Sequence, residues 1–208
     1  MYRLTEILPA AKGDRLLLRI SNDEGETVSL SVSCKLYAEL GLRRGVLDGD
    51  TAERLFASAD VEKATVKGLG MLGYGANSER RLKSKLRAKG FSEATAAEAV
   101  DGLVSRGYID EKRDALRLSD SLLKKRYGRK RILSSLRAKG YGDVAVAAVE
   151  DALDGVDFTG LCAELIKIKF KELPKEPAEM KKALAKLVAL GYNVSEAKNA
   201  MRAVARER

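Results

Sequence analysis

The sequence predicts a mainly α-helical protein, in which three tandem three-helix repeats follow a small N-terminal β-hairpin unit. The first observation is composition: aromatic residues make up only 5% of the 208 residues and tryptophan is absent, which favours helices over a β-sandwich or barrel. The second is a leucine, glycine, aromatic pattern that occurs three times, with its glycines 50 and 51 residues apart. A near-constant period is typical of stacked supersecondary units, so we expect an elongated array.

The N-terminal segment predicts a β-rich unit over residues 1–60. Residues 2–8 and 15–20 are rich in Leu and Ile, and residues 27–32 alternate between apolar and polar side chains, as a half-buried strand does. The turn-forming residues 22–26 between the last two strands predict a hairpin. Ser33 is then placed to cap a short helix that Gly41 ends.

A change to helical periodicity over residues 51–72 predicts one or two helices that lead out of the β-unit. We therefore place the first domain boundary at residue 60, with repeats over 61–114, 115–155 and 156–208. The letters of residues 68–73 match the Gly-x-Gly-x-x-Gly dinucleotide-binding motif. That motif requires a preceding buried strand in a βαβ unit, whereas here it lies in a helical segment, so we interpret it as a helix end.

The repeated pattern predicts how the middle helix of each repeat ends. It covers residues 82–91, 132–141 and 183–192, and its apolar residues lie four apart, on one helical face. The glycine that follows is suited to the left-handed position after a helix, and the next aromatic ring then folds back onto the helix end. We expect the repeated leucine and aromatic residues to be core rather than base-stacking platforms; they are Leu86, Leu136, Leu187, Phe91, Tyr141 and Tyr192.

Each glycine turn is followed by a residue that predicts the start of a third helix. These capping residues are Ser92, Asp143 and Asn193, the last with Glu196 three positions later as in a capping box. The third helices are expected over residues 94–106, 144–153 and 195–206. The first helix of each repeat is expected within residues 61–72, 115–126 and 158–170.

Several function classes are disfavoured by residues that the chain lacks. Histidine is absent, and Cys34 and Cys162 are far apart in sequence, so a structural zinc site and histidine-based catalysis are not expected. We interpret both cysteines as small buried apolar residues. With no phosphate-binding loop in the sequence either, we nominate no catalytic residue, metal ligand or cofactor and expect a protein that is not an enzyme.

The start of the chain has no long apolar segment, and no window reaches the length of apolar sequence that a membrane span needs. We therefore expect a soluble, cytoplasmic protein without a membrane partner.

Positive charge is concentrated in the helical part of the chain. The formal net charge is +9, yet residues 1–60 contain 8 Lys/Arg against 10 Asp/Glu. The densest cluster places six basic residues within residues 124–131, with no acidic residue between Asp120 and Asp143. Charge that is not interleaved with acids favours a polyanion-binding surface over a merely solvated helix face.

The candidate binding surface is expected to position a phosphate backbone or an acidic protein surface without reading bases. Four further basic residues would extend it if the repeats stack in register. The candidate residues are Lys124, Lys125, Arg126, Arg129, Lys130, Arg131, Arg137, Lys139, Arg87 and Lys89.

Three motifs resemble the RecX family, bacterial regulators of the RecA recombinase. They are Ser78-Glu79-Arg80-Arg81-Leu82, Gly107-Tyr108-Ile109-Asp110-Glu111, and Tyr127-Gly128-x-x-Arg131-Ile132 with Lys139-Gly140 downstream. The resemblance covers roughly residues 61–206. It implies a monomeric protein of DNA repair and the SOS response that binds the RecA filament on single-stranded DNA and limits its extension, strand exchange, ATPase and coprotease activities.

A second hypothesis is a stand-alone DNA-binding protein with tandem helix-turn-helix-like units. It predicts sequence-selective binding to duplex DNA through a recognition helix. The RecX resemblance predicts instead a filament-dependent complex, with at most weak, salt-sensitive affinity for free DNA.

Overall fold

The computed structural model describes residues 1–10, 13–169 and 176–206, and this part of the chain contains four strands and ten helices. It confirms a mainly α-helical fold with a small N-terminal antiparallel sheet. The contacts divide the chain into two compact units. Unit 1 comprises Met1–Tyr74 and Lys83–Arg106, and unit 2 comprises residues 75–82 and 107–208. No described helix is both long enough and apolar enough to span a membrane.

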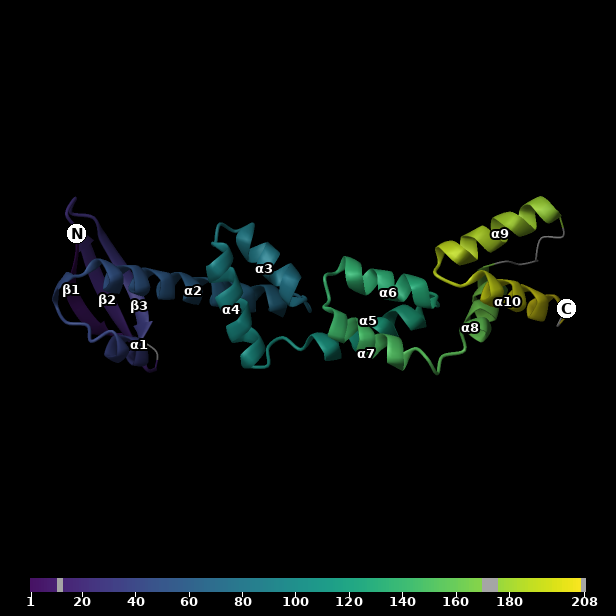
Figure 1. The fold of residues 1–208 in the computed structure, drawn as a ribbon, viewed down its shortest axis with the longest axis horizontal. Helices are drawn as coiled ribbons and strands as arrows, with labels where there is room; N and C mark the ends of the chain where they lie inside the picture. The colour runs from purple at the N-terminus through teal and green to yellow at the C-terminus, as the bar shows by residue number, and fades with distance from the viewer. Residues whose placement is uncertain (11–12, 170–175, 207–208) are drawn as a thin grey trace. The chain divides into compact units, whose positions relative to one another are not determined.

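The sheet of unit 1 confirms the three strands expected from the sequence and adds a fourth. Its antiparallel order is β3-β2-β1-β4 (Figure 1). The strands are β1 (Tyr2–Pro9), β2 (Arg15–Asn22), β3 (Thr27–Ser33) and β4 (Gly45–Leu47). β4 was not predicted because three residues are too few to show an alternating pattern. The buried face of the sheet carries Leu4, Leu18, Ile20, Leu30 and Val32.

A short helix after β3 has the predicted capping. In α1 (Cys34–Glu39), the Ser33 hydroxyl accepts a hydrogen bond from the Leu36 amide at 3.1 Å. The chain then reverses at Gly41, whose φ of +55° lies in the left-handed region that favours glycine. Both expectations for this segment are confirmed.

One continuous helix, α2 (Gly49–Gly73), follows where the sequence allowed one or two. It begins at Asp48, which accepts a hydrogen bond from the Thr51 amide at 2.8 Å. Its first half buries Leu55 in the core beneath the sheet, and its second half packs against α4 (Glu93–Ser105). The boundary expected at residue 60 therefore lies inside a helix, and residues 68–73 form the last turns of that helix.

The remaining helices follow the expected succession of three per repeat. The end of α2 precedes α3 and α4, and two further sets of three helices complete the chain (Figure 1). Phe170 and Pro174 lie outside the described residues, and Pro177 is the first residue of α9. The helices are α3 (Glu79–Arg87), α4, α5 (Glu111–Lys124), α6 (Arg129–Ala138), α7 (Asp143–Ala152), α8 (Phe158–Lys169), α9 (Pro177–Ala189) and α10 (Val194–Arg206).

The three glycine turns have the predicted geometry. Gly90, Gly140 and Gly191 have φ values of +95°, +79° and +98°. In each turn the amide of the next aromatic residue donates to the carbonyl of the repeated leucine, at 3.2–3.4 Å, as in a Schellman motif. Tyr141 and Tyr192 are buried, whereas Phe91 is half-buried. The repeated leucines are fully buried, so their expected core role is confirmed.

The predicted caps of the third helices are correct in two of three cases. Ser92 caps α4 by accepting from the Thr95 amide, and Glu196 accepts from the Asn193 amide at 2.7 Å. The expectation for Asp143 is wrong. Gly142 is the N-cap residue of α7, and Asp143 is its first helical residue, where a carboxylate still interacts favourably with the positive end of the helix dipole.

Candidate basic binding surface

The basic segment, defined as residues 124–131, forms the connection between α5 and α6. α5 ends at Lys124, and α6 begins at Arg129 after the N-cap residue Gly128. Arg126 lies between them with φ of +57°, a left-handed conformation that costs roughly 1–2 kcal/mol in a residue with a Cβ atom. The buried Tyr192 hydroxyl donates to the Arg126 carbonyl oxygen at 2.7 Å, which stabilises this conformation.

Two arginines of the segment are neutralised by carboxylates that come from elsewhere in unit 2. Arg126 Nε lies 3.0 Å from Glu164 Oε2, and an Arg129 terminal nitrogen lies 2.8 Å from Asp154 Oδ1. The Arg129 guanidinium also donates to a backbone carbonyl oxygen and lies over the Phe158 ring, 5.6 Å from its centroid. No acidic residue lies close to these arginines in the sequence, but the fold brings two carboxylates to them. Arg126 therefore attaches the turn to α8 in the third repeat, and Arg129 attaches it to the end of the second repeat, beside the Phe158 ring.

Arg131 is engaged without a carboxylate. Its guanidinium lies over the Tyr127 ring, 4.4 Å from the centroid, which is within the range of a cation–π interaction. It also donates to the Ala189 carbonyl oxygen at 3.3 Å. Arg131 thus joins the first turn of α6 to the end of α9 and retains its full positive charge.

The three lysines of the segment are the available charges. Lys124, Lys125 and Lys130 are exposed, and none of their side chains forms a hydrogen bond or ion pair with a residue in the described part of the chain. Their ammonium groups are free to bind a polyanion, because no interaction within the protein has to be broken first.

The first turn of α6 concentrates positive potential. It contains Arg129, Lys130 and Arg131 and no acidic residue, although cations are disfavoured at a helix N-terminus by about 0.3–1 kcal/mol each. Two backbone amides at this turn already have carbonyl partners. The Gly128 amide donates to the Leu190 carbonyl at 2.9 Å, and the Lys130 amide donates to the Gly191 carbonyl at 3.1 Å. An anion here would therefore find the Gly128 and Lys130 N–H groups bonded within the protein and would meet the basic side chains instead.

Gly128 and Gly191 lie backbone against backbone. A Cβ atom on Gly128 would overlap the carbonyl group of Gly191, and a Cβ atom on Gly191 would overlap the backbone of Arg131. The Tyr127-Gly128-x-x-Arg131 motif therefore has a packing role as well as a charge role, because it holds the start of α6 against the turn between α9 and α10.

A similar junction in unit 2 brings residues 78–81 to the turn between α6 and α7. The Ser78 hydroxyl donates to the Lys139 carbonyl at 2.7 Å, and the Arg80 side chain lies beside Gly140. Arg80 and Arg81 are exposed cations that are not among the binding residues predicted from the sequence. The repeat pattern could have identified them, because they precede Lys130 and Arg131 by 50 residues, which is one repeat period.

The other four candidate residues divide between the two units. Arg137 and Lys139 lie at the end of α6 in unit 2, and both side chains are exposed without an ion pair to a described residue. Arg87 and Lys89 lie in unit 1, where Arg87 is 3.7 Å from Glu93. A continuous stripe through all four thus remains a prediction.

The pKa values of both cysteine thiols are raised above the ordinary value. Burial, with a smaller effect of Glu196, raises the pKa of the Cys162 thiol to about 12. A side-chain hydrogen bond with Asp14 raises the pKa of Cys34. Cys162 is buried as expected, but Cys34 is half-buried at the start of α1. Among the described residues, no group of three or more Cys, Asp or Glu side chains is placed to hold a metal ion.

No family model matches the chain, but its sequence is similar to that of a curated protein. The chain is 25% identical over 104 residues to the regulatory protein RecX of Bacillus mycoides (strain KBAB4). The matched segment covers 50% of this chain but only 38% of that protein.

The fold is similar to two solved structures. A crystal structure of regulatory protein RecX matches 95% of this chain and 98% of that chain, with a TM-score of 0.72 and 19% identity. The structure of RecX from Lactobacillus salivarius matches 71% of this chain and 97% of that chain, with a TM-score of 0.59 and 19% identity. Together with the sequence match, these structures confirm the resemblance to the RecX family.

Proposed function

We propose that this chain, which resembles RecX proteins in sequence and fold, regulates the RecA recombinase. It binds the RecA nucleoprotein filament on single-stranded DNA and limits filament extension, strand exchange, ATPase and coprotease activity. The observation that carries this proposal is the group of three exposed lysines, Lys124, Lys125 and Lys130, held in one turn between α5 and α6. It acts by binding and not as an enzyme, inside the bacterial cytoplasm.

The two kinds of basic residue have different roles in this mechanism. Arg126 and Arg131 fix the turn against the third repeat through Glu164 and the Ala189 carbonyl, and Arg129 fixes it against Asp154 at the end of the second repeat. The lysines contact the polyanion, which is the phosphate backbone of the bound strand or an acidic surface of the filament. Lysine acts as a point charge without a fixed donor geometry, so this contact selects charge and not base sequence.

The test is the triple variant Lys124→Glu/Lys125→Glu/Lys130→Glu. Wild-type protein added in substoichiometric amounts should depress the ATPase and strand-exchange rates of RecA on single-stranded DNA. The triple variant should lose most of this inhibition, because attraction becomes repulsion, while its helical circular dichroism stays unchanged. The matched control is Lys181→Glu/Lys182→Glu/Lys198→Glu, which makes the same charge change at exposed positions of α9 and α10 and should still inhibit.

Two outcomes count against the proposal. Unchanged RecA rates with folded wild-type protein would refute the function itself. Full inhibition by the lysine triple variant would move the contact to another surface. Arg129 and Arg131 are left unchanged because reversing them would also break the junction with the third repeat.

The second hypothesis, a stand-alone DNA-binding protein, draws on the basic first turn of α6, where a recognition helix would meet a groove. Against it, that turn is packed on Gly191, and the Gly128 and Lys130 amides are bonded to the Leu190 and Gly191 carbonyls. Co-sedimentation with and without preformed filament separates the two. Filament-dependent binding supports regulation of RecA, whereas tight, sequence-selective binding to free duplex supports the alternative.

A further inference from the structure

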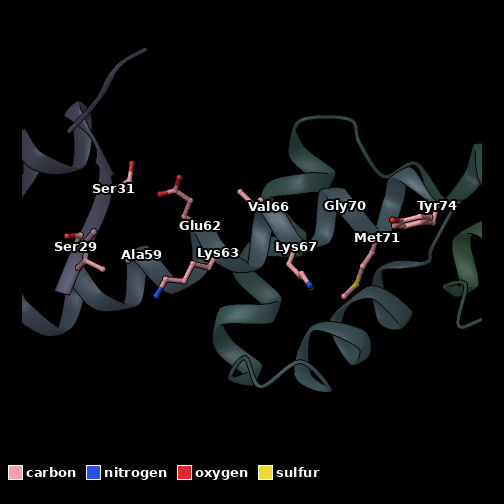
Figure 2. A pocket seen from close by; sticks show the side chains of 11 residues that line it. Ser29, Ser31, Ala59, Glu62, Lys63, Val66, Lys67, Gly70, Met71 and Tyr74 are labelled. Atoms are coloured by element: carbon pink, nitrogen blue, oxygen red, sulfur yellow. The ribbon is translucent and has the colours of Figure 1, made fainter. Parts of the chain in front are cut away.

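Unit 1 contains a groove between β3 and an exposed face of α2. Its volume is about 640 Å³, and it is lined by residues 29–31 of the strand and by residues between Ala59 and Tyr74 of the helix. Figure 2 shows the side chains from both elements that border it. The groove lies in a different unit from the basic segment, and the proposed function does not use it.

One wall of the groove is an unprotected edge strand. β3 pairs only with β2, so its other edge has no partner strand in the described part of the chain. Edge strands are usually blunted by charge, proline, a bulge or short length. The opposite edge, β4, has only three residues. β3 has seven residues, of the sequence Thr-Val-Ser-Leu-Ser-Val-Ser, with no charge and no proline, so nothing in its sequence prevents another strand from pairing with it.

The other wall is an apolar stripe that runs along the second half of α2 to its C-cap residue, Tyr74. Val66, Gly70 and Tyr74 are four residues apart and therefore share one helical face. Val66 is 64% exposed and Tyr74 is 97% exposed, although large apolar side chains on a helix usually face a core. A Cβ atom on Gly70 would have no neighbour within 4 Å. The missing side chain at this position leaves room for one from a bound segment.

The charges that border the groove favour an acidic ligand. Glu62 is paired with Arg15, so its negative charge is compensated. Lys63 pairs at 3.0 Å with Asp60 in an exposed contact, and Lys67 has no ion pair with any described residue. Arg15 also donates to the Ser31 carbonyl at 2.8 Å. This bond satisfies one end of the strand edge and leaves the stretch before Ser31 open.

We propose that this groove binds an extended peptide segment of a partner protein, which adds a fifth strand beside β3. Main-chain hydrogen bonds to the strand edge would supply affinity, and every second side chain would point onto α2, as in other cases of β-strand addition. The peptide side chain opposite Gly70 is apolar. A second peptide side chain, near Lys67, carries a carboxylate. A second copy of this chain fits less well, because β3 carries no acidic side chain to meet Lys67.

The test uses a synthetic peptide of the length of β3, seven residues, in which valine and glutamate alternate. Its binding to the full chain is measured by fluorescence anisotropy, and the contacts are located from amide chemical-shift changes. The glutamate peptide should shift the amides of residues 27–31 and of the end of α2. A peptide with lysine in place of glutamate should bind at least about tenfold more weakly.

Two variants probe the two walls separately. Gly70→Gln fills the groove with an uncharged side chain and should weaken binding at least about tenfold. Its matched control is Ala57→Gln, at an exposed position of α2 that does not line the groove. Ser29→Pro removes an amide from the open edge and should weaken binding to a similar extent. If Ser29→Pro loses the strand signal in circular dichroism, the test of the proposal depends on Gly70→Gln alone.

Three results would overturn the proposal. The first is absence of binding of the glutamate peptide or equal binding of the lysine peptide. The second is unchanged affinity in Gly70→Gln. The third is a concentration-dependent dimer in sedimentation that Gly70→Gln abolishes, which would assign the groove to a second copy of the chain.

Discussion

At the scale of single residues, two glycines decide how the basic segment is held. Gly128 and Gly191 meet without side chains between them, so the amides of Gly128 and Lys130 reach the Leu190 and Gly191 carbonyls. The lysines of the turn are thereby presented from a rigid backbone.

We expect Gly128→Ala to destabilise the protein strongly. The new methyl group would overlap the Gly191 backbone, which cannot give way as a flexible side chain does, and overpacking of this kind costs about 2 kcal/mol or more. Urea unfolding measures the change. Gly155→Ala is the matched control, because a Cβ atom there has open space, and it should change the unfolding free energy by less than about 1 kcal/mol. Equal stability of both variants would contradict the close contact.

A second residue-scale prediction concerns alkaline pH. Burial raises the pKa of Cys162 from an ordinary value of 9.0 to about 12, and burial also raises the pKa of Tyr192. The folded protein keeps these protons while the unfolded chain releases them. Their stabilising contribution is therefore complete below pH 9.0 and is lost as the pH rises toward 12. The urea midpoint should fall over this window, and it should fall less steeply in Cys162→Ala; identical slopes would exclude a role for Cys162.

At the scale of elements, side chains fasten successive helices to one another. The Glu111 carboxylate at the start of α5 accepts from the Glu79 amide of α3 at 2.7 Å and from the Gly142 amide before α7 at 2.9 Å. Three elements that are distant in sequence meet at one side chain. Ser78 reinforces the same place, because its hydroxyl accepts from the Arg81 amide and donates to the Lys139 carbonyl.

We expect Glu111→Gln to cost about 1–3 kcal/mol of unfolding free energy, the range for losing a charge-assisted hydrogen bond or leaving a donor unpaired. A glutamine has one acceptor oxygen, so one of the two amides would face an NH₂ group instead. Glu150→Gln, at an exposed position of α7, is the control and should leave the denaturant midpoint almost unchanged. If both variants unfold at the same midpoint, Glu111 does not join the helices in solution.

At the scale of the whole molecule, charge and apolar surface are placed on different parts of the chain. The acidic first 60 residues contain the sheet with its open edge, whereas the excess of Lys and Arg belongs to the repeats. Each unit therefore offers a separate surface: the lysines of the basic segment in unit 2 and the groove beside β3 in unit 1.

Salt dependence tests the whole-molecule role of the charge. If Lys124, Lys125 and Lys130 contact phosphates of the DNA strand in the filament, the affinity of this protein for the filament should depend on salt. The logarithm of the binding constant should fall linearly with the logarithm of the salt concentration. The lysine triple variant should reduce the slope by about 2, at about 0.7 per phosphate contact on single strands. The slope is obtained from anisotropy titrations of filament at several salt concentrations. An unchanged slope would mean that these lysines do not meet phosphate.

Much of the fold could be predicted because its signals are local. The glycine turns, the first three strands and the succession of helices depend on residues close in sequence, such as Leu136 followed by Gly140 and Tyr141. Where the local signal was short or ambiguous, prediction failed. β4 is too short to show a pattern, and the cap of α7 is Gly142 and not Asp143.

The repeat period, the class of fold and the place of the basic segment can be read from local sequence, because periodicity and glycine preference are set by neighbouring residues. Which charges of that segment are available depends on contacts between residues that are distant in sequence. Glu164 and Asp154, far along the chain, neutralise Arg126 and Arg129 and leave the three lysines exposed. The groove beside β3 has the same origin, since its two walls, residues 29–31 and the second half of α2, are separate in sequence and come together only in the fold.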